Sequence, residues 1–139
     1  MKKIGILTHH YIHNYGAFLQ GYALQEAVKK LYPNDEVYMI DFVNKKHAVK
    51  NTLGWFRYNP NKDSIKSYMQ KIKLPRIFKK TQKKYYNLTK RIKNTEDLNN
   101  LNLDAIIVGS DEVWHYEDIA RHPMKFGYEV KVPKLIAYA

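Results

Sequence analysis

The 139-residue sequence predicts an α/β protein with a parallel sheet, and three observations support this prediction. Residues 4–8 and 105–108 are short apolar runs rich in β-branched residues, as expected of strands buried on both faces of a sheet. Residues 36–41 form a further expected strand. A helical pattern lies between the strands at 4–8 and 36–41, and a strand-helix-strand crossover of this kind makes the two strands parallel.

The helix between the first two strands has one apolar stripe. Asn14 is the expected N-cap, and Pro33 belongs to the segment that ends the helix. Small residues near its start allow it to lie close to a sheet or a ligand. The stripe residues recur at spacings of three and four, the period of a helix face: Ala17, Gly21, Leu24, Val28 and Leu31.

The middle of the chain is expected to hold a loop and two amphipathic helices. Residues 51–61 contain Gly54, Pro60 and several Asn, which favours a loop. A helix is predicted over 64–73, and Pro75 is well placed as the first residue of another. Residues 87–93 are expected to be extended and 95–101 to form a short helix. The predicted apolar faces consist of Ile65, Tyr68, Met69 and Ile72 in the first helix and Leu74, Ile77 or Phe78, Thr81 and Tyr85 in the second.

The strand at 105–108 ends in a turn. Gly109 allows a sharp change of direction, and the short polar side chains of Ser110 and Asp111 can cap the next segment. Residues 134–139 read as a fourth, buried strand. A doubly wound sheet does not normally end on such a strand, so we expect a fragment or a domain that needs a partner half.

The positive charge is concentrated in one segment. The net charge of the chain is +11, and residues 45–93 contain 16 Lys and Arg but one acid, Asp63. This segment could bind nucleic acid, another anionic polymer or a membrane surface, with Tyr85, Tyr86 and Trp55 as stacking groups. We favour solvated helices with basic outer faces, because the apolar positions keep helical spacing.

The composition excludes several classes of protein. There are no cysteines, so disulfides and thiolate metal sites are excluded. No apolar run approaches the length of about 18 residues that a membrane span needs. The apolar stretch after Met1 is too short for a signal peptide. We therefore expect a soluble cytoplasmic protein.

Two candidate site segments are predicted to share one edge of the sheet. Ligands of open α/β sheets lie beyond the carboxyl ends of the parallel strands. Residues 9–16 follow the first strand, and residues 109–111 follow the strand at 105–108. The spacing of His9, His10 and His13 would suit zinc on a helix, but these residues precede the helix, so we expect no metal site. Beside the start of the helix, a histidine can donate a hydrogen bond or shuttle a proton.

Four stretches of the sequence resemble the polysaccharide pyruvyl transferase family. Lys3-Ile-Gly-Ile-Leu-Thr-His-His10 and Asn14-Tyr-Gly-Ala-Phe-Leu-Gln-Gly-Tyr-Ala-Leu-Gln25 resemble its opening. The stretch from Leu103 to Trp114 (Leu-Asp-Ala-Ile-Ile-Val-Gly-Ser-Asp-Glu-Val-Trp) resembles its second signature, and residues 136–139 resemble the strand that follows. His13, Glu112 and His115 depart from the family pattern, which bears on the choice of substrate more than on the fold.

The resemblance implies a fold and a reaction. Family members have two Rossmann-like halves arranged as in glycosyltransferases of the B type. Residues 1–139 match the first, acceptor-side half, with a basic helical insertion at about 45–93 and the C-terminal half absent. The implied reaction transfers a pyruvyl group from phosphoenolpyruvate to a glycan hydroxyl, without a cofactor or metal. The donor-binding residues and the family's best-supported catalytic basic residues are expected in the second half.

Within this half, the resemblance implies roles for nine residues. Asp111 and His10 are the candidate proton acceptors. The candidate substrate-binding residues are Asn14, Tyr15, Gly16, Gln20, Gly109, Ser110 and Trp114, of which Tyr15 and Trp114 could pack against a sugar ring. Two alternatives remain open. One is a non-catalytic module that binds an anionic polymer through residues 45–93, and the other is an inactive truncated product.

Overall fold

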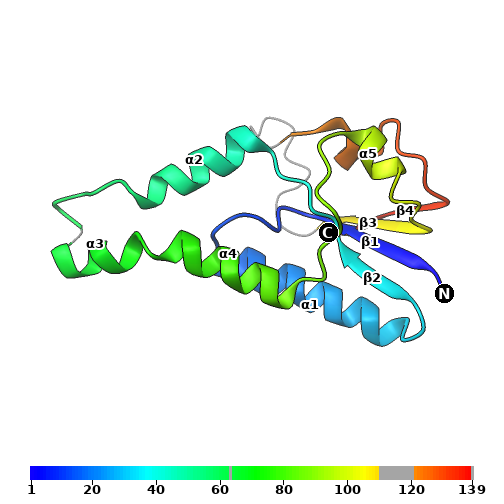
Figure 1. The fold of residues 1–139 in the computed structure, drawn as a ribbon, viewed down its shortest axis with the longest axis horizontal. Helices are drawn as coiled ribbons and strands as arrows, with labels where there is room; N and C mark the ends of the chain where they lie inside the picture. Colours follow the sequence, from blue (N-terminus) through cyan, green and yellow to red (C-terminus); the bar gives the residue numbers. More distant parts are fainter. Residues whose placement is uncertain (63, 110–120, 139) are drawn as a thin grey trace.

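The computed structural model describes residues 1–62, 64–109 and 121–138. Its centre is a four-stranded sheet formed by β1 (Lys3–Leu7), β2 (Glu36–Met39), β3 (Ala105–Gly109) and β4 (Lys134–Tyr138). The strand order is β2-β1-β3-β4, and all three adjacent pairs are parallel (Figure 1). The predicted α/β fold with a parallel sheet is therefore confirmed.

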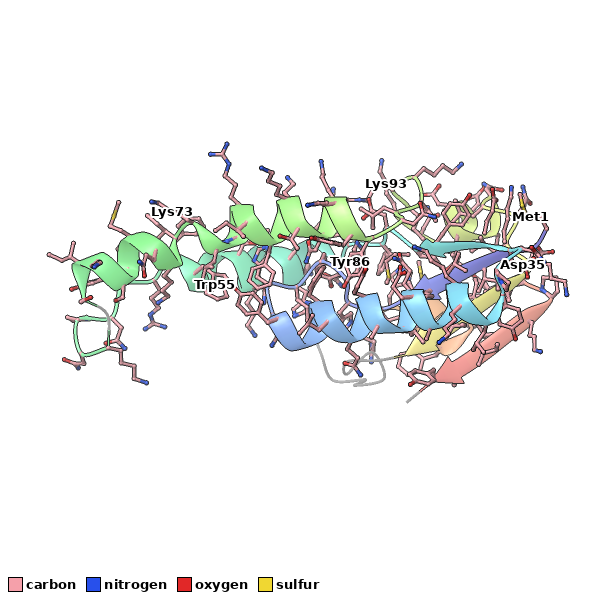
Figure 2. The ribbon with its side chains drawn as sticks, turned by 90° about the horizontal axis from the view of Figure 1, so that it is seen from below. Met1, Asp35, Trp55, Lys73, Tyr86 and Lys93 are labelled. Atoms are coloured by element: carbon pink, nitrogen blue, oxygen red, sulfur yellow. The ribbon has the colours of Figure 1, made fainter. Side chains whose placement is uncertain are left out.

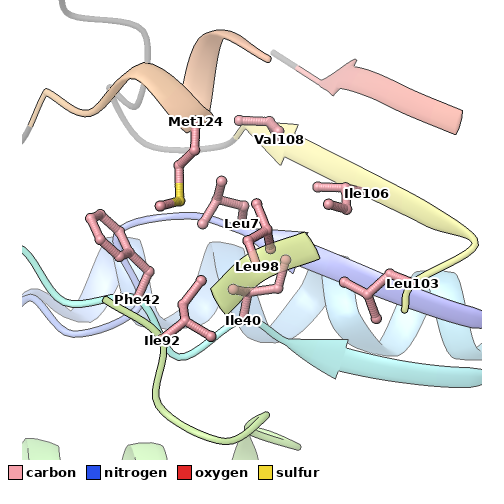
Figure 3. Packing of buried hydrophobic residues seen from close by; sticks show 9 residues of the cluster. All are labelled: Leu7, Ile40, Phe42, Ile92, Leu98, Leu103, Ile106, Val108 and Met124. Carbon is pink, nitrogen blue, oxygen red and sulfur yellow. The ribbon is translucent and has the colours of Figure 1, made fainter. Parts of the chain in front are cut away.

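The two faces of the sheet bury separate apolar clusters. Ile6 is aligned with Met39 on one side and Ile107 on the other, and these side chains pack beneath α1 (Tyr15–Leu31). On the opposite face, α5 (Thr95–Asn99) and the short 3-10 helix η1 (Pro123–Phe126) contribute Leu98 and Met124 to the second cluster (Figure 3). Its buried members are Leu7, Ile40, Phe42, Ile92, Leu98, Leu103, Ile106, Val108 and Met124.

Helix α1 begins and packs largely as predicted. The Asn14 side chain accepts a hydrogen bond from the Ala17 N–H at 3.2 Å, which confirms the predicted N-cap. Gly21 is buried, and a Cβ there would lie 2.9 Å from the Tyr86 hydroxyl oxygen. This hydroxyl donates to the Phe18 carbonyl oxygen at 2.9 Å. The small residue at position 21 therefore allows a close approach between α1 and Tyr86.

Three helices form an arm that projects away from the sheet (Figures 1 and 2). They are α2 (Lys45–Trp55), α3 (Ile65–Lys71) and α4 (Leu74–Tyr85). The base of α4 lies beside α1, where the Gln25 amide nitrogen donates to the Tyr85 carbonyl oxygen at 3.1 Å. Residues 87–93 then return to the sheet as an extended segment, with parallel bridges from Leu88 to Met39 and from Ile92 to Phe42.

The loop predicted at residues 51–61 is wrong for its first half, because α2 continues to Trp55. Contacts from other parts of the chain stabilise this helix despite its turn-forming residues. Asn44 caps its start by accepting from the His47 N–H at 3.2 Å. The Asn51 side chain accepts from the His13 N–H at 3.0 Å, and the Trp55 ring packs near Phe78.

The predicted apolar faces are wrong at several positions. Leu31, at the end of the predicted stripe, is 72% exposed, whereas Gln25 is fully buried in the same helix. Its amide bonds the backbone of the segment after α4, including the Asn87 N–H at 2.9 Å. Gln82 is likewise buried and donates to the Ile12 carbonyl oxygen. Exposed side chains from the faces predicted for the arm are Ile65, Met69, Ile77 and Tyr85.

The fourth strand is present but is not buried as predicted. β4 pairs with β3 along its whole length, yet each of its side chains is exposed. β4 is the edge strand on one side of the sheet. Helix α1 packs against β2, which is the edge strand on the other side. Among the described residues, no helix is long and apolar enough to cross a membrane.

Candidate functional site

Buried polar side chains gather where β1 and β2 end. Thr8, His9 and His10 follow β1 directly, and Asp41 lies two residues beyond β2. All four residues are less than 10% exposed. Buried polar groups are costly unless they are hydrogen-bonded, and in α/β sheets this edge is the usual place for ligands. This edge is therefore the candidate functional site.

A chain of three side chains runs from the interior of this site to its surface. The His10 Nε2 atom lies 3.2 Å from Asp41 Oδ1, and Arg91 Nε donates to Asp41 Oδ2 at 2.8 Å. The Asp41 N–H donates to the Thr89 hydroxyl oxygen at 3.0 Å, which ties the residue to the segment that carries Arg91. His10 is buried, whereas the Arg91 side chain is 60% exposed.

The charge state of Asp41 determines which ring nitrogen of His10 carries the hydrogen. Burial alone would raise the pKa of the Asp41 carboxyl, but the hydrogen bonds to His10 and Arg91 outweigh this effect and lower the pKa. An ionised carboxylate only accepts hydrogen bonds, so His10 Nε2 carries the hydrogen. The other ring nitrogen, Nδ1, is buried and has no hydrogen-bond partner within the described part of the chain. In neutral His10 this atom is an acceptor.

At the His10 end of these three side chains, four rings pack together, those of Tyr11, His9, His10 and His47. The Tyr11 hydroxyl lies 3.0 Å from His47 Nδ1, and the His9 and His47 ring centroids are 5.6 Å apart. Tyr11 also meets the His10 ring edge-on at 5.7 Å. The Lys125 amine contacts His9 Nε2, and this lysine is only 1% exposed. Lys125 therefore brings a buried amine from η1 to the site.

A basic pocket of about 760 Å³ adjoins the exposed end of Arg91. Its walls come from the start of α2, from the segment 91–93 and from residues 121–122. Lys45, Lys46, Arg91, Lys93 and Arg121 line it, and none of its lining residues is acidic. Backbone N–H groups at the first turn of α2 add partial positive charge there. The pocket thus has the electrostatic character of a site for a phosphate or carboxylate.

His122 closes the apolar side of this pocket. Its ring lies 4.8 Å from that of Phe42, and its Nδ1 atom is 3.4 Å from the Met124 N–H. Burial lowers the pKa of the His122 imidazole, and the charge of Lys125 lowers it further. His122 is therefore neutral at pH 7, and the fixed positive charge of the pocket comes from its Lys and Arg side chains.

The sequence of this chain matches the model of a known protein family. The family model for polysaccharide pyruvyl transferases matches residues 14–139. The chain belongs to the polysaccharide pyruvyl transferase family. The matched range includes Asp41, Arg91 and the basic pocket, whereas His10 lies just before it. No match was found among curated proteins or among solved structures.

The structure of this pyruvyl transferase family member separates the predicted site residues into groups. His10 forms the interior end of the hydrogen-bonded chain of side chains His10–Asp41–Arg91. The N-terminal residues of α1 lie outside it: Tyr15 is 62% exposed, and its ring packs 4.7 Å from that of Phe78 on α4. Asn14 uses its side-chain oxygen as the helix cap. Gly16 and Gln20 are both exposed on α1.

Gly109 lies at the predicted edge and has a clear structural role. β1 and β3 are adjacent and parallel, so their carboxyl ends share one edge of the sheet, as predicted. Gly109 has a φ of +148°, and a Cβ would lie 1.6 Å from the Tyr138 carbonyl oxygen. Only glycine fits this close approach to β4. The predicted site residues Ser110, Asp111 and Trp114 lie outside the described residues.

Several residues of the site were not predicted from the sequence. Asp41 had a usable signal, because it follows β2 at the position aligned with Thr8, next to the histidines that follow β1. Arg91, His47 and Lys125 had no local signal, since distant segments bring them to the site. Within the described ranges, no group of three or more His, Asp or Glu side chains is placed to hold a metal ion.

Proposed function

We propose that residues 1–139 form the acceptor-side half of a pyruvyl transferase that acts on phosphoenolpyruvate and a glycan. In this proposal a second Rossmann-like half completes an architecture of the glycosyltransferase B type. The observation that carries the proposal is the adjacency of a buried, oriented imidazole and a basic pocket at one sheet edge. Membership of the pyruvyl transferase family supports it.

The proposed reaction needs acid-base groups and positive charge. A proton adds to the methylene carbon of phosphoenolpyruvate, and two glycan hydroxyl oxygens bond to its central carbon while the carbon–phosphate oxygen bond breaks. The two hydroxyl groups lose one proton each. One proton ends on the new methyl group and the other on the released phosphate. A base must therefore receive a hydroxyl proton, and cations must stabilise the phosphate and the carboxylate.

His10 is the residue that we assign as the base in this half. The hydrogen on Nε2 is held by Asp41, so the buried Nδ1 atom keeps the lone pair that a proton acceptor needs, and a substrate hydroxyl must enter the site to reach it. Asp41 acts as a positioning residue, because its carboxylate orients the ring and stabilises the imidazolium that forms. Arg91 holds Asp41 in place and also lines the basic pocket. Asp111 remains a second candidate base.

A phosphate-release assay tests this function. The chain is mixed with phosphoenolpyruvate and a glycan acceptor, alone and together with a C-terminal half from the same family. We expect glycan-dependent phosphate release from the joined halves, and at least a 100-fold lower rate after His10→Gln, as is typical for loss of a general base. Joined halves that release no phosphate with any acceptor contradict the enzyme proposal.

The basic pocket has its own matched variants. Arg91→Gln removes a cation from the pocket, and Arg76→Gln removes an exposed cation of α4 that does not line it. Calorimetric titration with phosphoenolpyruvate should show weaker binding for Arg91→Gln by about tenfold, consistent with loss of a charged hydrogen bond. The Arg76→Gln control should bind like the unaltered chain. Equal affinity for both variants would remove the pocket from the proposal.

The second candidate function is a non-catalytic module that holds an anionic polymer through residues 45–93. The observation that favours it is the number of solvated cations on α2, α3 and α4. This function predicts polymer binding that falls steeply with salt and does not change after His10→Gln. A flat salt response, or binding that requires His10, would exclude it.

A further inference from the structure

The far end of the arm exposes apolar side chains that the core does not use. We define the arm tip as residues 53–62 and 64–73, which comprise the end of α2, the following turn and α3 (Figures 1 and 2). Ile65 is 78% exposed and Met69 49% exposed, and their spacing of four places them on one face of α3. Leu53 and Phe56 are exposed at the end of α2. Apolar side chains gathered in this way mark a surface for a partner.

The arm tip also contains a basic hollow of about 550 Å³, lined by residues that are neighbours in sequence of Leu53 and Phe56. Three cationic residues line it, Arg57, Lys62 and Lys71, together with Tyr58, Gly54, Asn59 and Pro60. None of these lining residues is acidic. The single acid of the segment 45–93, Asp63, lies outside the described residues. The hollow therefore suits a phosphate-bearing group.

The hollow is held in shape by contacts between α3 and the turn before it. The Tyr68 hydroxyl donates to the Phe56 carbonyl oxygen at 3.0 Å, and the Lys71 amine donates to the Arg57 carbonyl oxygen at 3.0 Å. The Tyr58 and Tyr68 rings meet edge-on at 5.2 Å. These contacts fix the backbone that carries the cations, so the basic hollow is a formed feature of the fold.

Cations beside mostly non-aromatic exposed side chains (Leu53, Ile65 and Met69) fit a lipid surface better than a nucleic acid, although Phe56 and Tyr58 are also exposed there. Nucleic acids use basic residues with stacking aromatic rings, whereas aliphatic side chains gain little from a phosphate backbone. Anionic membranes attract Lys and Arg and also provide an apolar layer for Ile, Leu, Met and Phe. None of the described helices can cross a membrane, so such an attachment would be peripheral.

We infer that the arm tip docks on an anionic phospholipid surface. The basic hollow receives lipid phosphates, and the exposed side chains of Ile65, Met69, Leu53 and Phe56 enter the headgroup layer. This attachment is independent of the proposed transferase chemistry, because the tip residues do not line the candidate functional site.

Vesicle co-sedimentation of the 139-residue chain tests the inference. One set of vesicles is phosphatidylcholine alone, and the other contains phosphatidylglycerol and phosphatidylcholine. We expect binding to the anionic vesicles that weakens as salt is raised. Each basic residue at a membrane surface contributes about fivefold to the partition coefficient. The double variant Arg57→Gln, Lys62→Gln should therefore bind roughly 25-fold more weakly.

Matched variants away from the arm complete the test. Lys30→Gln with Lys131→Gln removes the same charge from exposed sites off the arm and should change binding less than threefold. Ile65→Ser should weaken binding severalfold, whereas Leu31→Ser, at a similarly exposed residue of α1, should not. Circular dichroism of each variant verifies that it folds.

Three outcomes would overturn the inference. They are equal binding to neutral and anionic vesicles, unchanged binding by the Arg57, Lys62 double variant, and equal losses for the tip and control variants. Tight binding to RNA with no binding to vesicles would likewise assign the tip to a nucleic acid.

Discussion

Replacing Asp41 with asparagine should show how much the hydrogen bonds among His10, Asp41 and Arg91 contribute to stability. The carboxylate has an oxygen for each of two donors, His10 Nε2 and Arg91 Nε. An asparagine keeps the shape but has one oxygen, so its NH2 group must face one of these donors. Hydrogen bonds to charged groups contribute about 1.5–3 kcal/mol each when they are buried. The Arg91 bond is largely exposed and contributes less than about 1 kcal/mol.

The expected loss is therefore about 2 kcal/mol of unfolding free energy, or roughly 6–10 °C in Tm for a domain of this size. Urea denaturation followed by circular dichroism measures this loss. Asp35→Asn is the control, because Asp35 accepts from the Lys2 N–H at the surface, and it should cost less than about 1 kcal/mol. If Asp41→Asn lowers the unfolding free energy no more than the control does, our account of the hydrogen bonds among His10, Asp41 and Arg91 is refuted.

The same substitution should also change the form of His10. If the asparagine NH2 group donates to Nε2, the hydrogen of neutral His10 moves to Nδ1. Nitrogen chemical shifts of the labelled imidazole distinguish the two tautomers. An unchanged tautomer in Asp41→Asn would mean that the asparagine oxygen still accepts from Nε2 and that the NH2 group faces Arg91.

Two further predictions concern pH and backbone space. The folded-state pKa of Asp41 is lowered, so its contribution to stability is present above the unfolded pKa of about 3.9 and is lost as pH falls through the folded pKa. The stability difference between the unaltered chain and Asp41→Asn should therefore shrink with acid below about pH 4. A constant difference would contradict this prediction. Gly109→Ala should cost at least about 2–3 kcal/mol, because its Cβ would collide with the Tyr138 carbonyl in a left-handed conformation. Gly54→Ala, at a helical position with open space, should be neutral or stabilising by up to about 1 kcal/mol, and similar thermal shifts for the two glycine variants would contradict this.

The sheet was predictable because its strands carry their own signal. The apolar runs at β1 and β3 are short and β-branched, and these strands are buried on both faces. The crossover through α1 makes β1 and β2 parallel, and the shared edge of β1 and β3 follows from the parallel pairing expected for such a sheet. The position of His10 at this edge was therefore accessible from the sequence alone.

The rest of the site depends on contacts between distant segments. Arg91 reaches Asp41 because residues 87–93 return to the sheet, and no local pattern specifies that return. Helix α2 was missed because Asn51 and Gly54 favour turns, whereas in the fold Asn51 bonds the His13 backbone. Gln25 was not expected in the core, since its burial depends on backbone partners 60 or more residues away.

The burial of β4 failed as a prediction for a related reason. Its apolar residues satisfy the pattern of an interior strand, but the strand lies at the sheet edge with its side chains exposed. A periodic pattern shows that a strand suits a buried place and does not show which element covers it. The apolar face of α3 is a second example, because Ile65 and Met69 have helical spacing and remain exposed.

A nitrogen NMR titration with phosphoenolpyruvate tests the central claim most directly. The labelled His10 ring and Arg91 Nε are observed in the same sample, with His10→Gln and Arg91→Lys used for assignment. If the polar chain and the basic pocket form one ligand site, both signals should shift together and saturate at a single ligand concentration. If phosphoenolpyruvate binds while both signals stay unchanged, the polar chain and pocket do not form that site.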